Sequence, residues 1–162
     1  MQALGHLYAR HGAGVRSLVL RCDPSAGPEG ADEVCQETFL TFYDTLSRYE
    51  HRGALKRWLY GIALKKARNR RRRWWHRLGI RQRAGAEAAG VAVHHHDIDA
   101  RIDAHTRIAA LMAALPAAQR EVIALVHIEG LSVQQAAEIL AISDNAVSTR
   151  LYRARAALGG GR

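Results

Sequence analysis

The sequence predicts an all-α fold: two small helical domains joined by a flexible linker. Three observations lead to this prediction. Apolar side chains recur at helical spacing over most of the 162 residues. Aromatic residues make up only 6% of the chain while alanine and leucine are frequent, a composition that favours helices over strands. There are only three prolines, and no alternating run of Val, Ile and Thr of the strand type occurs.

The N-terminal domain is expected to span residues 1–76 and to contain three helices. Residues 23–30 separate the first helix from the second, because they hold two prolines and two glycines. The second helix is predicted over about residues 31–47, and its polar face begins with acids, which suits the dipole of a helix N-terminus. The first helix has a broad apolar face, made by Leu4, Leu7, Tyr8, Val15, Leu18 and Val19.

A short polar loop, residues 48–53, precedes a third helix that starts near Ala54. Trp58 falls on the apolar stripe of this helix, so we expect it in the core. From Lys65 onward the helix becomes strongly basic: residues 65–83 hold ten Lys or Arg and no acid, which leaves 14 basic and 15 acidic residues in the rest of the chain. The net charge of +9 therefore belongs to one stretch, as expected for a protein that binds a polyanion such as nucleic acid.

Residues 77–104 are predicted to form the flexible linker, since they are rich in glycine and alanine and lack amphipathic periodicity. A run of three histidines, residues 94–96, would support a metal-sensing alternative. Adjacent histidines point in divergent directions, however, and no cluster of Cys or His flanks the run at ligand spacing. Linker composition is the preferred interpretation, with no metal and no cofactor expected.

The C-terminal domain is expected over residues 105–158. An apolar helix ends before Pro116, which suits the first turn of the next helix, and Gly130 is expected to cap that helix at its C-terminus. Ser132 and Gln135 have the spacing of a capping box at the start of a short helix. A turn of about four residues, 141–144, leads to a last helix with Val147, Leu151, Ala154 and Leu158 facing inward.

The last two helices have the form of a helix-turn-helix, in which the second helix presents a polar and basic surface. A helix fits the major groove of DNA, where Asn, Ser, Thr and Arg side chains pair with base edges or phosphates. An ordinary helical hairpin with a solvated face would share this pattern.

Several classes of protein are not expected. No Gly-rich phosphate loop, metal-ligand motif or nucleophile with a placed base is present, so we expect no catalysis. The N-terminus lacks the apolar segment of a signal peptide. The sequence also contains no run of about 18 apolar residues, the length that a membrane-spanning helix needs. The cytoplasm is the expected location. Two cysteines, Cys22 and Cys35, make no disulfide framework, and Cys35 falls on an apolar stripe.

Three blocks of the chain, in order, resemble extracytoplasmic-function (ECF) sigma factors of the sigma-70 superfamily of RNA polymerase sigma factors. The first is ADEVCQETFL, residues 31–40, and the second is LKRWLYGIA, residues 55–63. The third runs from the Leu-Pro pair at residues 115–116 through GLS, AAEIL and VSTRLYRAR, residues 130–155. The resemblance covers nearly the whole chain outside the linker. It implies a non-enzymatic factor that directs core polymerase to specific promoters and helps to melt DNA.

The resemblance implies a role for each domain. Residues 1–76 would form a sigma region 2-like domain, which docks on the β′ coiled coil of core RNA polymerase and recognises and melts the minus-ten element. The acidic helix would form the docking surface, since its negative charge would be complementary to a basic partner. The residues implied are Asp32, Glu33, Gln36, Glu37, Phe39 and Leu40.

The loop before the third helix matches the family's loop that captures a flipped minus-ten base, and the basic block would hold phosphates of the melted strand. The minus-ten residues implied are Tyr49, His51, Arg52, Lys65, Lys66, Arg68, Arg70, Arg71, Arg72 and Arg73. Trp74 and Trp75 would pack on the first helix, stack on bases or touch polymerase.

Residues 105–158 would form a sigma region 4-like helix-turn-helix domain that reads the minus-thirty-five element as double-stranded DNA. Part of this domain would bind the polymerase β flap. By the same resemblance an anti-sigma factor is an expected partner. The reading residues implied are Ser143, Asn145, Ser148, Thr149, Arg150, Tyr152 and Arg153.

Three positions depart from the family pattern. Lys65 stands where many members have Asn, Ser148 stands where a basic residue is common, and Glu33 replaces the usual Asp. Lys65 and Ser148 lie where base-level specificity would be decided. Two other functions remain as alternatives: a helix-turn-helix regulator that acts without polymerase, and a metal-responsive sigma-like sensor that uses the cysteines and the histidine run.

Overall fold

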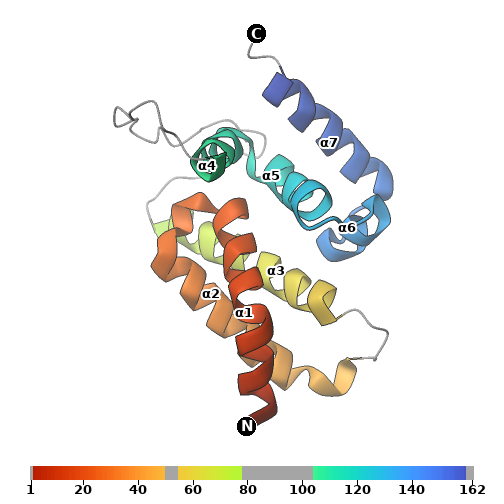
Figure 1. Ribbon diagram of the computed structural model, residues 1–162. Coiled ribbons are helices and arrows are strands. Elements are labelled where there is room, and N and C mark those ends of the chain that lie inside the picture. Colours follow the sequence, from red (N-terminus) through yellow and green to blue (C-terminus); the bar gives the residue numbers. More distant parts are fainter. Residues whose placement is uncertain (1, 50–54, 78–103, 160–162) are drawn as a thin grey trace.

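The computed structural model describes residues 2–49, 55–77 and 104–159, and every regular element within these ranges is a helix (Figure 1). The prediction of an all-α fold is confirmed. The stretch predicted as the linker lies almost entirely outside the described residues, since α3 ends at Arg77 and the next helix starts at Ala104. No helix in the described part of the chain is both long and apolar enough to cross a lipid bilayer.

The N-terminal lobe, residues 2–77, contains three long helices and two short 3₁₀ turns. These are α1 (Gln2–Cys22), η1 (Pro24–Ala26), α2 (Gly27–Asp44), η2 (Leu46–Arg48) and α3 (Leu55–Arg77). The three helices pack against one another around an apolar core (Figure 1). The core side chains include Val15, Leu18, Val34, Phe42, Leu59 and Leu64. Burying such side chains stabilises each helix by about 1.5–3 kcal/mol per residue.

Helix α2 begins at Gly27, four residues before the predicted start. Proline is tolerated in the first turn of a helix, where its missing N–H has no intrahelical partner, and Pro28 occupies that turn. Gly27 takes a positive φ of 64°, which lets the chain turn from η1 into α2. Gly30 is then inside the helix, and a Cβ built there would lie 2.5 Å from the Arg70 guanidinium. The glycine therefore leaves room for that side chain.

The C-terminal lobe, residues 104–159, contains α4 (Ala104–Ala114), α5 (Ala117–Ile123), a π-helical turn η3 (Ala124–Ile128), α6 (Val133–Leu140) and α7 (Asp144–Gly159). Pro116 is the residue just before α5, one position outside the predicted first turn. Gly130 has a positive φ of 69°, and both hydrogen bonds of the Ser132–Gln135 capping box form. Val147, Leu151 and Ala154 are buried as predicted, whereas Leu158 is 36% exposed near the end of α7.

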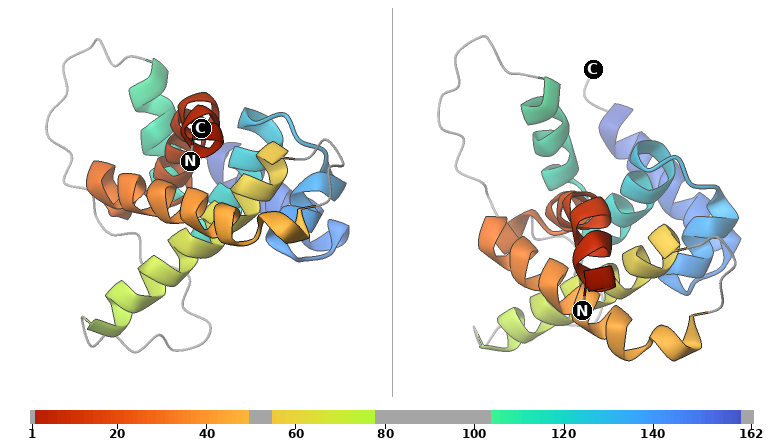
Figure 2. Two further views of the ribbon diagram at one scale, coloured as in Figure 1. Left: turned by 90° about the horizontal axis from the view of Figure 1, so that it is seen from below. Right: turned by 60° about the horizontal axis from the view of Figure 1, so that its bottom comes forward.

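The two lobes pack directly against each other, which the sequence did not predict. Helix α1 contacts α4, α5 and η3, and α3 lies against α6 (Figures 1 and 2). Where α3 approaches α6, Gly61 faces the backbone of α6: a Cβ built there would lie 3.9 Å from the Ile139 carbonyl oxygen, an ordinary van der Waals distance. The contact between the lobes is hereafter the seam.

Candidate functional site

The acidic face predicted on the second helix lies on the surface of α2. Asp32, Glu33 and Glu37 are half-buried or exposed, with 49%, 57% and 35% of their side-chain surface accessible, and Gln36 is exposed. Val34 and Cys35, on the opposite side of the same turns, are buried in the core. The helical period therefore separates the two faces as expected.

Each acid of this face is paired with a cation of its own lobe. Arg16 Nε lies 2.5 Å from Asp32 Oδ1, Lys66 Nζ lies 3.4 Å from Glu37 Oε2, and Arg70 Nε lies 3.3 Å from Glu33 Oε2. Such exposed pairs contribute little to stability, about 0–1 kcal/mol each. The acids are therefore positioned by α1 and α3 yet can exchange these partners for another cation at small cost.

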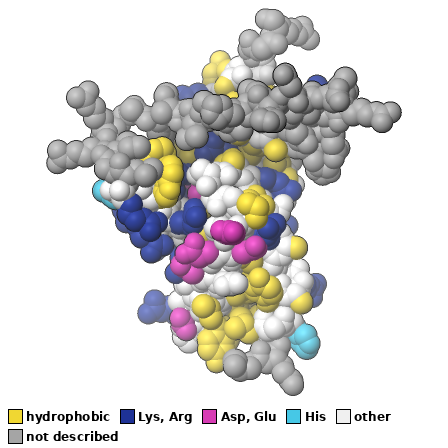
Figure 3. All heavy atoms as spheres, turned by 90° about the vertical axis from the view of Figure 1, so that its left-hand side faces the viewer, with side chains coloured by type: hydrophobic (Ala, Val, Ile, Leu, Met, Phe, Trp, Pro, Cys, Tyr) yellow, Lys and Arg dark blue, Asp and Glu magenta, His cyan; other side chains and the backbone are white. Residues whose placement is uncertain are grey.

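An apolar surface continues α2 beyond the acids. Leu40 is 60% exposed and Tyr43 is 55% exposed, whereas Phe39 is buried with its ring 5.0 Å from that of Tyr8. Figure 3 shows acidic side chains grouped on one face of the molecule, with Lys and Arg beside them and exposed hydrophobic side chains below. Of the two apolar residues predicted for docking, Leu40 is on the surface and Phe39 lies beneath it.

Tyr49, at the start of the predicted base-capturing loop, is held in a cluster of aromatic rings. Its ring lies 5.8 Å from the ring of Phe42 and 5.8 Å from that of Trp58, both edge to face. Trp58 was expected in the core but is 37% exposed, because it closes the outer edge of this cluster. His51 and Arg52 lie outside the described residues.

The basic block on α3 divides into two groups that the sequence does not distinguish. Lys66, Arg68 and Arg70 are half-buried and bind the carboxylates of Glu37, Glu121 and Glu33, respectively. Lys65, Arg72 and Arg73 are exposed and, among the described residues, form no ion pair. Arg71 is half-buried. The exposed group is the part of α3 that is directly available to a polyanion.

The end of α3 carries a basic cleft. This cleft, of about 480 Å³, is lined by Glu33, Arg70, Arg73, His76 and Arg77. The adjacent indole rings of Trp74 and Trp75 lie 4.8 Å apart, edge to face, and Trp74 is 37% exposed. Cations beside an exposed aromatic ring are the usual elements of a single-strand binding surface.

The polar face predicted for the last helix is exposed on α7. Asn145, Ser148, Thr149 and Arg153 are exposed, Arg150 is half-buried, and Tyr152 is 75% exposed. Ser143 has a different local role, because its Oγ accepts a hydrogen bond from the Ala146 N–H at 3.2 Å and so caps the helix. The turn before it is formed by Ala141, which takes the left-handed φ of 54°.

Two carboxylates of the C-terminal lobe bind cations of the N-terminal lobe at the seam. Arg68 donates from Nε and Nη2 to the two oxygens of Glu121, at 2.9 and 2.5 Å, and Glu121 is only 3% exposed. These hydrogen bonds raise the pKa of Arg68. Charge-assisted bidentate bonds of this kind are the stronger ones in proteins. One feature of the sequence could have indicated that Glu121 is buried: it directly precedes Val122 and Ile123, which are themselves buried.

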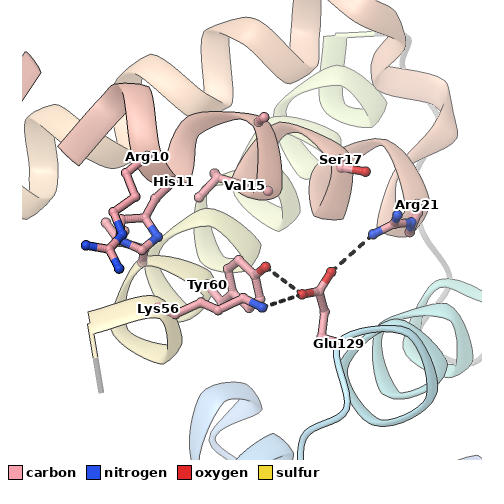
Figure 4. Close-up of a pocket in the computed structure, with 11 residues that line it drawn as sticks. Arg10, His11, Val15, Ser17, Arg21, Lys56, Tyr60 and Glu129 are labelled. Atoms are coloured by element: carbon pink, nitrogen blue, oxygen red, sulfur yellow. Dashed lines mark hydrogen bonds and ion pairs between the residues drawn. The ribbon is translucent and has the colours of Figure 1, made fainter. Parts of the chain in front are cut away.

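The second carboxylate, Glu129, accepts from three donors, as the dashed lines in Figure 4 show. These are Tyr60 Oη at 2.7 Å, Lys56 Nζ at 2.9 Å and Arg21 Nη1 at 3.1 Å. Burial raises the pKa of Glu129, but the hydrogen bonds from Tyr60 and Lys56 and the charge of Arg21 outweigh it, so the net pKa is lowered. Nothing in the sequence around Glu129 indicated this role.

A cleft of about 520 Å³ opens at this part of the seam, lined by residues of α1 and α3 together with Glu129 (Figure 4). Its positive charges come from Arg10, Arg21 and Lys56, and Glu129 is the one acid in its lining. Burial and the charges of Arg10 and Lys56 lower the pKa of His11. The cleft therefore has a positive potential, which Glu129 partly neutralises.

The metal-sensing alternative finds no site in the described ranges. No group of three or more His, Cys, Asp or Glu there could hold a metal ion. Cys22 and Cys35 are separate buried thiols, and burial raises the pKa of each. His94, His95 and His96 lie outside the described residues.

Comparison with known families matches both lobes. The profile described as Sigma-70 region 2 matches residues 7–77, and the profile described as Sigma-70, region 4 matches residues 105–158. The chain is 33% identical to the RNA polymerase sigma factor CnrH of Cupriavidus metallidurans, over 97% of this chain and 85% of that protein. It is 32% identical to the sigma factor NccH of Alcaligenes xylosoxydans xylosoxydans, over 96% and 84% of the two chains.

Two solved structures share the arrangement of the helices. The sigma factor RpoE, in complex with the anti-sigma factor NepR from Bartonella quintana, matches with a TM-score of 0.76 at 19% identity, over 99% of this chain and 96% of that one. CnrH, in complex with the cytosolic domain of CnrY, matches with a TM-score of 0.65 at 28% identity, over 98% and 86%. The first of these shows likeness of fold only.

Proposed function

Since the chain belongs to the sigma-70 family of RNA polymerase sigma factors, as a member of the ECF group, we propose that its two lobes divide promoter recognition between them. The N-terminal lobe docks on core polymerase and binds the minus-ten element. The C-terminal lobe reads the minus-thirty-five element. The observation that carries this division is the presence, on one chain, of an exposed acidic face on α2 and an exposed polar face on α7.

Docking uses the acidic face of α2 with Leu40 and Tyr43 beside it. The partner is the β′ coiled coil of core polymerase. Asp32, Glu33 and Glu37 offer carboxylates at the surface, and their present ion pairs are weak enough to be exchanged for cations of a partner. The two exposed apolar side chains add area that is removed from water on binding.

Minus-ten binding uses the basic side of α3 and the loop that Tyr49 anchors. Lys65, Arg72 and Arg73 hold phosphates of the melted strand, because they are exposed cations on one helix. Phosphate contacts give affinity without sequence preference, so base recognition falls to the loop, where a flipped base needs a pocket.

Minus-thirty-five reading uses α7 in the major groove. Asn145, Ser148, Thr149 and Arg153 present donors and acceptors at the surface, and Tyr152 adds an exposed ring. Ser143 contributes through the cap that fixes the start of the helix.

An anti-sigma factor is the regulator we propose, since both solved structures that the chain resembles were determined with an anti-sigma protein or a domain of CnrY. The polymerase carries out the chemistry of transcription, and the chain works where polymerase is, in the cytoplasm.

The proposed function is tested by run-off transcription with core polymerase on genomic fragments, followed by mapping of start sites. Promoter-specific transcripts are expected with the wild-type chain. Glu33→Lys/Glu37→Lys, which reverses two charges of the docking face, is expected to lose core binding in a pull-down. Glu138→Lys/Asp144→Lys reverses two exposed acids of the C-terminal lobe, away from α2, and is the control. DNA binding without core binding by the wild type would favour the polymerase-independent regulator instead.

A further inference from the structure

The cleft that opens beside Glu129, hereafter the seam cleft, has the size of a small-molecule site and no part in the proposed function. Its volume of about 520 Å³ lies within the range of pockets that bind small molecules, about 300–1,000 Å³. None of its lining residues belongs to the docking face of α2, to the exposed cations of α3 or to the reading face of α7. The seam cleft is therefore a separate feature of the surface.

One face of α1 forms a wall of the seam cleft. The residues of this wall are four, three and four positions apart, so the helical period places them on one side of α1. They are Arg10, Gly14, Ser17 and Arg21. Arg10 and Arg21 are about 16 Å apart along the helix axis, at opposite ends of the wall. Figure 4 shows Lys56, Tyr60 and Glu129 between these ends, so the cleft is elongated, with a cation at each end and a third between them.

The floor of the seam cleft is apolar, whereas its rim is charged. Val15 and Leu59 belong to the lining and are almost fully buried, so they form the floor. Gly14 keeps space free beside them, since a Cβ built there would lie 3.4 Å from Tyr60 Oη. An apolar pocket with a few convergent polar groups has the usual composition of a ligand site.

The rim carries more cations than its one acid can neutralise. Glu129 receives one contact from Lys56 Nζ, at 2.9 Å, and one from Arg21 Nη1, at 3.1 Å. Ammonium and guanidinium groups each have further N–H donors beyond one contact. Arg10 is exposed and forms no ion pair with any described residue. The seam cleft therefore has unused donors and an excess of positive charge.

His11 lies in this positive field. Its half-buried side chain belongs to the lining, and burial together with the charges of Arg10 and Lys56 lowers the pKa of the imidazole. The ring is therefore mostly neutral at about pH 7. An anion bound beside it would raise the pKa, because a nearby negative charge favours the protonated ring. His11 is thus a built-in reporter of anion binding.

Phosphate groups match the rim better than single carboxylates do. A phosphate monoester carries about two negative charges and several acceptor oxygens, and arginine binds such a group through paired N–H donors. Cations spread along about 16 Å of α1 fit an anion with several charged groups in a row, which a chain of phosphates supplies. A cleft of about 520 Å³ admits a molecule of nucleotide size rather than a folded protein domain.

We propose that the seam cleft is a binding site for a soluble oligophosphate, either a nucleoside triphosphate or a short inorganic phosphate chain. Arg10, Lys56 and Arg21 bind successive phosphates along the wall of α1. Lys56 and Arg21 keep their contacts with Glu129, which holds both side chains at the rim. The ligand occupies a surface separate from those proposed to bind polymerase and DNA.

Isothermal titration calorimetry of the full chain with sodium tripolyphosphate and with ATP tests the site, at about 0.1 M salt. One saturable site is expected, and Arg10→Gln is expected to weaken it on the order of tenfold, because one charge-assisted contact is lost. Arg107→Gln makes the same change at an exposed position of α4 and is expected to bind as the wild type does. Tighter binding of ATP would identify a nucleotide as the ligand, and equal binding would identify the phosphate chain alone.

NMR titration of the His11 ring with pH locates the bound anion. The chain has nine histidines, and the signal of His11 is identified by its absence from His11→Gln. Saturating tripolyphosphate is expected to raise the pKa of His11 in the wild type and in Arg107→Gln. Circular dichroism verifies that each variant keeps its helix content.

Three results would each overturn the site. The first is the absence of saturable binding, or equal affinities of Arg10→Gln and Arg107→Gln for tripolyphosphate. The second is an unchanged pKa of His11 at saturation. The third is an equal loss of affinity of Arg10→Gln for a single-stranded oligonucleotide, which would make the cleft part of the DNA path. Failure to direct transcription would bear on the proposed function alone, since the two use different residues.

Discussion

DNA binding by α3 is expected to depend on its exposed cations far more than on its paired ones. Two variants remove the same charge from the same helix. Lys65→Ala/Arg72→Ala removes exposed cations, whereas Lys66→Ala/Arg70→Ala removes cations that carboxylates of α2 already bind. From sequence alone the two variants are equivalent, since all four residues lie in one basic block.

The magnitude follows from counterion release. Each cation that neutralises a phosphate of single-stranded DNA contributes about 0.7 to the slope of log K against log salt concentration. Losing two such contacts lowers the slope by about 1.4, which is about 25-fold in affinity at 0.1 M salt. The paired cations have already exchanged their counterions for Glu37 and Glu33, so their loss is expected to change the slope by less than about 0.5.

The assay is fluorescence anisotropy of a labelled single-stranded oligonucleotide with the purified chain, between 50 and 200 mM salt. The free chain is the right sample, because the pairs with Glu33 and Glu37 are intact before polymerase competes for these acids. Equal loss of slope in both variants would refute the reasoning, since it would mean that the intramolecular pairs do not withhold Lys66 and Arg70 from DNA.

Three further outcomes are expected. Ser132→Ala removes the Oγ that accepts from the Gln135 N–H in the capping box and should lower the free energy of unfolding by about 1 kcal/mol in urea titrations; Gln135→Ala, which removes the reciprocal acceptor of the Ser132 N–H, should lose only part of this. Glu129 has a lowered pKa, so its stabilisation is complete above the ordinary value of 4.5 and is lost as pH falls through the folded pKa. The difference in melting temperature between wild type and Glu129→Gln should accordingly shrink from pH 7 to about pH 3. Tyr152→Ala, at a side chain 75% exposed, should leave stability within about 0.5 kcal/mol while promoter binding by the holoenzyme weakens; unchanged binding would exclude this ring from the DNA contact.

Local signals predicted most of the elements because they depend on near neighbours in the chain. The stripe that includes Val147, Leu151 and Ala154 repeats at helical spacing, and all three side chains are buried. The Ser132–Gln135 box needs only residues three apart, and both of its bonds form. The start of α2 was misplaced, because Pro28 was interpreted as a helix breaker although proline is compatible with a first helical turn.

The sequence predicted which residues share a helix face in each candidate surface. It did not predict which of their charged groups are free to bind a partner and which are already paired within the chain. The helical period placed Asp32, Glu33, Gln36 and Glu37 on one side of α2, and the structure agrees. Which cations pair with which acids depends on how α1, α2 and α3 cross, and crossing is decided by packing of the whole lobe. Arg70, for instance, reaches Glu33 across the bare backbone of Gly30, a contact between residues far apart in the chain.

The sequence by itself determined the helical class, the order of the elements, the concentration of positive charge after residue 65 and the family to which the chain belongs. Each of these properties depends only on residue types and on short separations along the chain. Only the tertiary structure decided that the lobes meet, that Arg68 faces Glu121, and that Glu129 sits among Tyr60, Lys56 and Arg21. These partners are between 53 and 108 residues apart, and no local pattern encodes a charge pair over such a separation. Burial in the assembled fold strengthens the attraction within each pair, because the local dielectric is low, and it also adds the cost of removing the charges from water.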